Sequence, residues 1–90
     1  MQEKIKNLEE KINIWNGKDI IILQKGFLES KYEIDNLSYK VEYEILEINS
    51  QNNKNYIKIN LNQIYEIEIK SDEIEIYLDN DIKVNLTLKQ

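Results

Sequence analysis

Charged and apolar residues alternate almost without a break from residue 66 to residue 88, in the segment EIEIKSDEIEIYLDNDIKVNLTL. A period of two places successive side chains on opposite faces of an extended chain, so this pattern indicates half-buried β-strands rather than a helix. Ser71-Asp72 and the Asp-Asn-Asp sequence at 79–81 interrupt the alternation with residues typical of turns. This part of the chain therefore predicts strands joined by tight turns, which makes sequential neighbours antiparallel.

The same period of two extends back to residue 19. It predicts strand segments at 19–23, 29–35, 38–48, 55–61, 64–70, 73–78 and 82–88. Within the segment at 38–48 the apolar positions change phase at Ile45-Leu46, which predicts a β-bulge or a sharp bend. The Leu-Asn-Gln-Ile sequence at 61–64 also breaks the phase and predicts a corner between two strands.

Residues 3–15 have the period of a helix instead. Gly17 follows at a position where a helix-ending residue in the left-handed conformation is expected. Two heptads are too few for a coiled coil, so we expect the apolar stripe of this helix to pack on the sheet. The stripe consists of Ile5, Leu8, Ile12 and Trp15. The sheet face beneath it is expected to include Ile67, Ile69, Ile74, Ile76 and Val84.

The predicted fold class is α+β in a single domain over residues 1–90. One N-terminal helix (3–15) packs on a bent antiparallel sheet of six or seven strands, which is a meander over 19–88 and in the alternative is barrel-like. A chain of this length buries roughly 60–65% of the surface that its unfolded form exposes. The core is therefore expected to be thin, without room for a deep internal pocket.

A row of glutamates is expected on the outward face of the last strands. Ile69 and Ile74 must face the same core, so a turn at Ser71-Asp72 pairs them and places Glu68 directly opposite Glu75. Like charges across a strand pair are destabilising by about 0.2–1 kcal/mol. The predicted partner-binding residues on this face are Glu66, Glu68, Glu73, Glu75 and Tyr77.

Two interpretations of this acidic row stand beside each other. In the first it is the solvated side of a sheet, and in the second it is an anionic surface that binds a basic partner. Lys70 and Lys83 are expected to reduce the repulsion between carboxylates at the edges of the row and to leave its centre without a counter-ion. Tyr77 in the middle and Tyr65 nearby suit an interface, because tyrosine is enriched among binding hot spots.

Composition excludes several classes of function. Seventeen acidic residues against twelve basic ones give a net charge of −5, which opposes direct binding to nucleic acid. Without histidine or cysteine there is no ready general base and no thiolate ligand, so no catalytic, cofactor-binding or metal-binding residue is predicted. No apolar stretch approaches the roughly 20 residues of a membrane helix. The lack of cysteine and of an apolar leader favours a cytoplasmic location.

Two resemblances add expectations about function. A helix at 3–15 followed by bent strands, with YIKINLNQIYEIEI as a closing segment, is similar to small barrels of the Sm or SH3-like kind, which implies an adaptor. The chain lacks the RNA-contact motifs of Sm proteins. In size, acidity and lack of a catalytic constellation it resembles small phage-encoded inhibitors of bacterial defence, such as anti-CRISPR proteins. That resemblance implies an acidic surface that occupies a basic channel of a partner.

The function expected from these observations is that of a non-enzymatic protein-binding module. The specific hypothesis is a stoichiometric inhibitor from a phage or mobile element, whose acidic sheet face blocks a basic surface of a partner protein. One alternative is a self-assembling structural module that pairs through strand edges, for example as a homodimer. The other is the small-barrel adaptor. The abundance of Ile, Lys, Asn and Glu is typical of proteins from AT-rich genomes.

Overall fold

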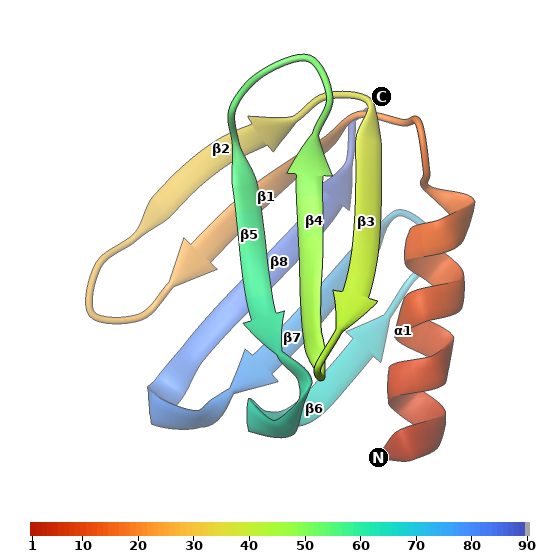
Figure 1. Ribbon diagram of the computed structural model, residues 1–90. Coiled ribbons are helices and arrows are strands. Elements are labelled where there is room, and N and C mark those ends of the chain that lie inside the picture. The colour runs from red at the N-terminus through yellow and green to blue at the C-terminus, as the bar shows by residue number, and fades with distance from the viewer. Residues whose placement is uncertain (90) are drawn as a thin grey trace.

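The computed structural model describes residues 1–89 of the chain, and within them it has one α-helix, eight β-strands and two 3₁₀ turns (Figure 1). The α-helix is α1 (Gln2–Ile14). The strands are β1 (Ile20–Lys25), β2 (Ser30–Ile34), β3 (Leu37–Glu42), β4 (Ile45–Ser50), β5 (Tyr56–Asn60), β6 (Ile64–Ile69), β7 (Glu73–Leu78) and β8 (Ile82–Leu88). The 3₁₀ turns are η1 (Leu61–Gln63) and η2 (Asp79–Asp81).

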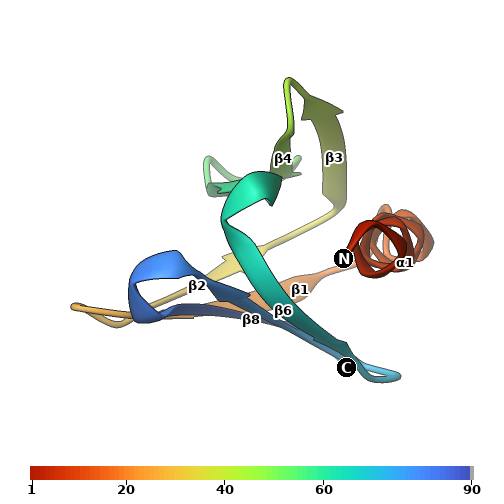
Figure 2. The ribbon, with the colours of Figure 1, turned by 90° about the horizontal axis from the view of Figure 1, so that it is seen from below.

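The strands form two antiparallel sheets. The larger sheet has five strands in the order β2-β1-β8-β7-β6, and the smaller has three in the order β3-β4-β5. Seen from below, the small sheet rises from the large one, and α1 lies at the open side between them (Figure 2). The α+β class and the antiparallel pairing are confirmed. The prediction of one sheet was wrong, and the sheets do not close into a barrel.

The chain changes sheets at two places. After β2, Asn36 has a positive φ of 56°, and its N–H donates to Asp19 Oδ1 at 2.8 Å, which fixes the turn into β3. After β5, η1 carries the chain into β6, and Asn60 caps this turn by accepting from the Asn62 N–H at 2.9 Å. The corner predicted at 61–64 is therefore confirmed. The meander is interrupted, because β1 pairs with β8 at the centre of the large sheet.

The strand count of six or seven was wrong because the segment at 38–48 is a hairpin rather than one bent strand. Tyr43 and Glu44 form its two-residue turn with φ values of 51° and 63°. Asparagine and glycine favour this conformation, and neither is present, so the turn carries no sequence signal. A tertiary contact holds it instead: the Leu61 N–H donates to the Glu44 carbonyl oxygen at 2.9 Å.

The core lies between the two sheets and α1. Leu8 and Ile12 of the helix and its C-cap residue Trp15 are buried as predicted, and Ile5 packs against them partly buried. The small sheet contributes the inward side chains Leu46, Ile48, Ile57 and Ile59. Four of the five predicted residues of the large sheet are buried, namely Ile67, Ile74, Ile76 and Val84. Ile69 was predicted wrongly: it is 38% exposed, because it ends the edge strand β6 and has a strand neighbour on one side only.

Gly17 ends the helical segment as expected. Its φ of +84° lies in the left-handed region, which glycine adopts without a steric penalty. The Gly17 N–H donates to the Leu37 carbonyl oxygen at 2.8 Å, and the Leu37 N–H donates to the Lys18 carbonyl oxygen at 2.9 Å. These two bonds tie the end of α1 to the start of β3, so the helix is fixed against the small sheet.

Candidate interaction surface

The last three strands have the register that the sequence predicted. Glu68 lies opposite Glu75, Ile69 opposite Ile74, and Glu66 opposite Tyr77. On the other side of β7, Tyr77 lies opposite Lys83. The predicted site residues therefore share one surface, the solvent side of β6, β7 and β8, which we call the β6–β8 face.

A β-bulge adds a residue that the alternation did not place there. The pairing shifts between Ile64 and Glu66, which leaves Tyr65 as the extra residue of β6. The Tyr65 ring lies against the Tyr77 ring, with 6.2 Å between centroids and planes tilted by 45°. Tyr65 is 58% exposed. The bulge thus sets two tyrosine rings side by side among the glutamates.

Glu75 is the centre of an ion-pair network, and not an unrelieved charge as the sequence suggested. Lys83 Nζ lies 2.7 Å from one of its carboxylate oxygens, and Lys70 Nζ lies 3.2 Å from the other. The Tyr77 hydroxyl donates to Glu75 at 2.7 Å. The Lys83 ammonium also lies over the Tyr77 ring, 5.3 Å from its centroid. As a result Glu75 is only 9% exposed, although it is on the outward side of the sheet.

The network fixes the protonation states of its members. Hydrogen bonds from Lys83, Tyr77 and Lys70 lower the pKa of Glu75 from 4.5 to about 2. The hydrogen bond to Glu75 raises the pKa of Lys70, Lys83 and the Tyr77 hydroxyl above their ordinary values. Every shift moves a pKa further away from pH 7. The carboxylate and the two ammonium groups therefore stay charged, the Tyr77 hydroxyl stays protonated, and the cluster offers no proton donor or acceptor near pH 7.

The other predicted carboxylates differ in how far they are paired. Glu66 accepts from Lys4 of α1 and from the Ile67 N–H, and these bonds lower its pKa. Glu73 lies 3.3 Å from Lys70 Nζ and accepts from Asn85 at 3.0 Å. Within residues 1–89, Glu68 is the member of the row that makes no ion pair. The four carboxylates thus face three ammonium groups, so the β6–β8 face carries little net charge.

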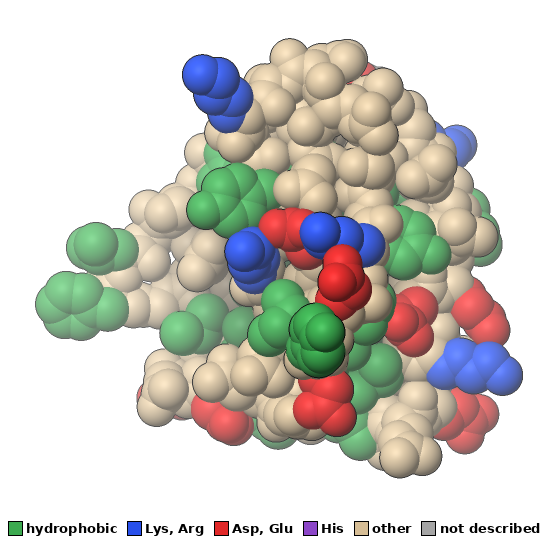
Figure 3. Space-filling view, in the orientation of Figure 1, with side chains coloured by type: hydrophobic (Ala, Val, Ile, Leu, Met, Phe, Trp, Pro, Cys, Tyr) green, Lys and Arg blue, Asp and Glu red, His purple; other side chains and the backbone are tan. Residues whose placement is uncertain are grey.

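A second ion-pair ladder crosses the solvent side of the small sheet, and the sequence did not reveal it. Lys40, Glu47 and Lys58 lie opposite one another on β3, β4 and β5, with N–O distances of 3.5 and 3.7 Å. Basic and acidic side chains alternate across these strands beside a shallow hollow of about 400 Å³ (Figure 3). Because 38–48 was taken as one strand, the register that aligns these three residues could not be derived.

The edges of the sheets are partly protected against pairing with another chain. Asn55 Nδ2 donates to the Glu33 carbonyl oxygen at 2.8 Å, so the loop after β4 covers the outer edge of β2. On β6 the Ile67 N–H donates a hydrogen bond to the Glu66 side chain, so it is not available to another strand. On β5 a lysine, Lys58, occupies the middle of the edge strand, which is a common guard against edge pairing. These contacts weaken the case for self-assembly through strand edges.

The described part of the chain, residues 1–89, contains no group of three or more acidic, cysteine or histidine side chains placed to hold a metal ion. Over the same range, no helix has both the length and the apolar character needed to cross a membrane. Comparison of the chain with models of protein families, with curated proteins and with solved structures finds no match.

Proposed function

We propose that this chain is a non-enzymatic protein-binding module that uses its β6–β8 face to contact a basic surface of a partner protein. The observation that carries the proposal is the tyrosine pair, with Tyr65 exposed and Tyr77 partly buried, beside Glu68, which makes no ion pair within residues 1–89. Glu68 is close enough to Tyr77 for its charge to contribute to the raised pKa of that hydroxyl. An aromatic anchor next to a carboxylate without a counter-ion is a suitable site for a lysine or arginine of a partner.

The charge pattern defines what each residue contributes. Glu75 already forms ion pairs with Lys70 and Lys83, so its role is to position these lysines and the Tyr77 hydroxyl on the face. Glu68 is the carboxylate available to a new cation. Charges on such a face mainly steer association and select partners, while the buried aromatic area supplies affinity. The net charge of −5 directs this selection toward basic proteins and away from nucleic acid itself.

The specific form of the proposal is a stoichiometric inhibitor that covers a basic, nucleic-acid-binding surface of its partner. A sheet face with fixed charges can cover such a surface without a catalytic step. An adaptor built as a closed small barrel has less support, because the two sheets remain open. The anti-CRISPR-like hypothesis rests on size, acidity and composition, and it defines the class of partner to be tried first.

The test has two steps. A partner is first captured with the wild-type protein, identified and purified, and is then titrated with purified variants. We expect Glu68→Lys and Tyr65→Ala each to weaken binding, with the Glu68→Lys effect mainly in the association rate and smaller at high salt. Glu10→Lys makes the same charge change on the exposed side of α1 and serves as the matched control. If both face variants bind as tightly as Glu10→Lys, the β6–β8 face is not the site.

A further inference from the structure

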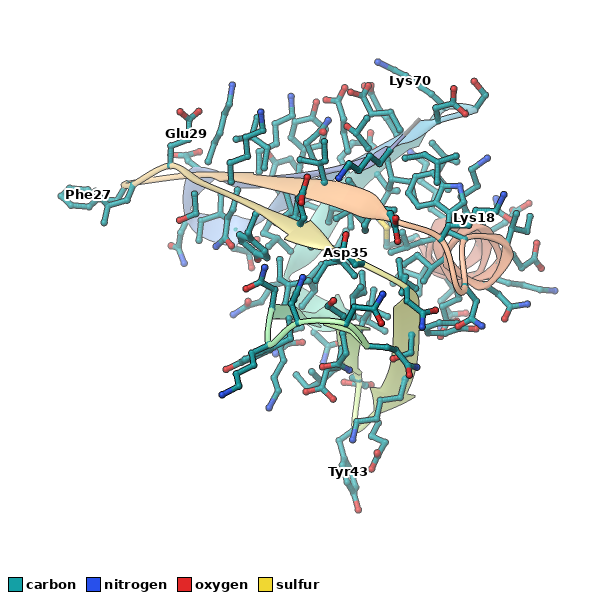
Figure 4. All side chains as sticks on the ribbon, turned by 90° about the horizontal axis from the view of Figure 1, so that it is seen from above. Lys18, Phe27, Glu29, Asp35, Tyr43 and Lys70 are labelled. Carbon is teal, nitrogen blue, oxygen red and sulfur yellow. The ribbon has the colours of Figure 1, made fainter. Side chains whose placement is uncertain are left out.

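The tip of the β1–β2 hairpin carries two large apolar side chains in full contact with solvent. Phe27 is completely exposed and Leu28 is 76% exposed. Phe27 points away from the body of the molecule at the far end of the hairpin (Figure 4). Hairpin loops ordinarily contain Gly, Asn, Asp, Pro or Ser, so two consecutive large hydrophobic residues at this place need an explanation.

The base of this tip is held in place. β1 and β2 remain paired as far as Gln24 and Ser30. Gly26 lies directly on Ile82, where a Cβ atom would come within 3.2 Å of the isoleucine Cγ1. Across the loop, Lys25 Nζ lies 3.9 Å from a Glu29 carboxylate oxygen. Phe27 and Leu28 thus form an apolar knob on a fixed base, with a cation on one flank and an anion on the other.

A hollow adjoins the knob. Its volume is about 230 Å³, and its walls include Gln24, Ser30 and Ile82 together with the tip itself. A cavity of about 150 Å³ is enough to bind benzene, so the hollow has room for a phenyl ring. The same small surface therefore presents both an apolar knob and a space that accepts one.

We propose that two copies of this chain associate through the tips of their β1–β2 hairpins. A two-fold axis places Phe27 of each copy in the hollow beside Ile82 of the other. The same axis sets Lys25 of one copy against Glu29 of the second copy and the reverse, so both flanks are complementary. A surface with a knob, a hollow and opposite charges on its two sides is suited to this isologous contact.

The β3–β4 hairpin shows why the charges matter. Its tip also carries an exposed aromatic side chain, since Tyr43 is 95% exposed and projects from the small sheet (Figure 4). Tyr43 is flanked by Glu42 and Glu44, which are both acidic. A two-fold contact through this tip would bring like charges together. The two hairpins thus form a natural comparison: both have an aromatic tip, and only the β1–β2 tip has complementary flanks.

The expected association is weak. Each buried phenylalanine contributes about 150–250 Å², so the contact falls below the roughly 1,200 Å² of a standard stable interface. A dimer of this size should form with a dissociation constant on the order of 100 µM rather than in the nanomolar range. This contact adjoins the β6–β8 face, because Lys25 lies opposite Lys83 of β8, but its partner is a second copy of the chain and not a basic protein.

Sedimentation analysis of the purified protein, from about 10 µM to about 1 mM around that expected constant, tests the proposal. We expect the average mass to rise from the monomer value of 10.8 kDa toward twice that value. Phe27→Ser should remain monomeric throughout the range, while Tyr43→Ser should associate like the wild type. Both positions are solvent-exposed, so circular dichroism should show the same fold for all three proteins.

Charge exchange provides a second, independent measurement. Lys25→Glu alone and Glu29→Lys alone place like charges on both flanks, and each variant should associate at least about tenfold more weakly at low salt. An equimolar mixture of the two variants should regain association, because each flank then meets its opposite. A wild-type protein that stays monomeric at all concentrations overturns the proposal, as does a Phe27→Ser protein that associates normally. A mixture that associates no better than the single variants overturns the two-fold geometry.

Discussion

Replacing Glu75 by glutamine should destabilise the protein at neutral pH. Glutamine keeps the shape of the side chain and an oxygen that accepts from the Tyr77 hydroxyl, which lies 2.7 Å from the carboxylate. It removes the negative charge that Lys83 and Lys70 contact at 2.7 and 3.2 Å. The substitution therefore isolates the contribution of the ion pairs from that of packing.

The magnitude follows from the pKa of Glu75. A fall from 4.5 to about 2 corresponds to about 3 kcal/mol of favourable interaction with the carboxylate. Lys70 and Lys83 are partly exposed, so solvent screens the interaction, and we expect a loss of about 1–2 kcal/mol at pH 7. Because folding lowers the pKa, this contribution is present above about pH 5 and is lost as the pH falls toward 2.

Urea unfolding followed by circular dichroism at pH 7 and at several values down to pH 2 measures both effects. The wild type should lose stability more steeply than Glu75→Gln between about pH 5 and 2, and the two curves should converge at the acidic end. Glu68→Gln, on the same face but without an ion pair, is the matched control and should change little at pH 7. Equal stability of Glu75→Gln and wild type at pH 7, with parallel acid titrations, would refute the assignment of Glu75 as the centre of the network.

Three further substitutions test other parts of the fold by thermal or urea unfolding. Trp15→Ala should cost about 3–5 kcal/mol, because the ring is buried in the core, and a change below about 1 kcal/mol would contradict its place there. Replacing Tyr43-Glu44 by Asn-Gly should stabilise the β3–β4 hairpin by about 1 kcal/mol, since these residues favour positive φ; a loss of stability would mean that the Glu44 side chain matters more than the turn. Glu68→Lys should stabilise the free protein by at most about 0.5 kcal/mol, because Glu75 already has two lysines; a destabilised variant would show that Glu68 has a partner of its own.

The register of β6, β7 and β8 could be predicted because every step in it is local. Ser71-Asp72 marks the turn, and Ile69 and Ile74 must share a face, so the pairing of Glu68 with Glu75 follows without knowledge of the rest of the chain. The pairing of β1 with β8 is long-range, since it joins Ile20 to Leu88, which are far apart in the sequence. No local pattern specifies which distant strand lies beside β1, and therefore the division into two sheets was missed.

The chemistry of the β6–β8 face was predicted only in part, because opposite positions were considered and diagonal ones were not. Lys70 and Lys83 are each diagonal to Glu75 across a strand pair, at a separation that a long side chain can span. Their ammonium groups converge on Glu75 from both sides and neutralise the centre of the row. Tyr65 was missed for a similar reason: a one-residue bulge is invisible to a period of two, and it changes which face a side chain occupies.

On both solvent-facing sheet surfaces, a glutamate of an inner strand lies between two lysines, one on each side of its strand. Glu75 lies between Lys70 and Lys83, and Glu47 lies between Lys40 and Lys58. The strands together carry a net charge of −2 and α1 carries none, so the larger part of the net charge of −5 comes from the segments that connect these elements. An acidic strand row is thus weak evidence for an anionic site until the diagonal lysines have been counted. Within residues 1–89, Glu68 is the carboxylate of the row that no lysine contacts. The binding of a partner that recognises the sheet by charge must therefore depend on this residue more than on any other carboxylate of the row.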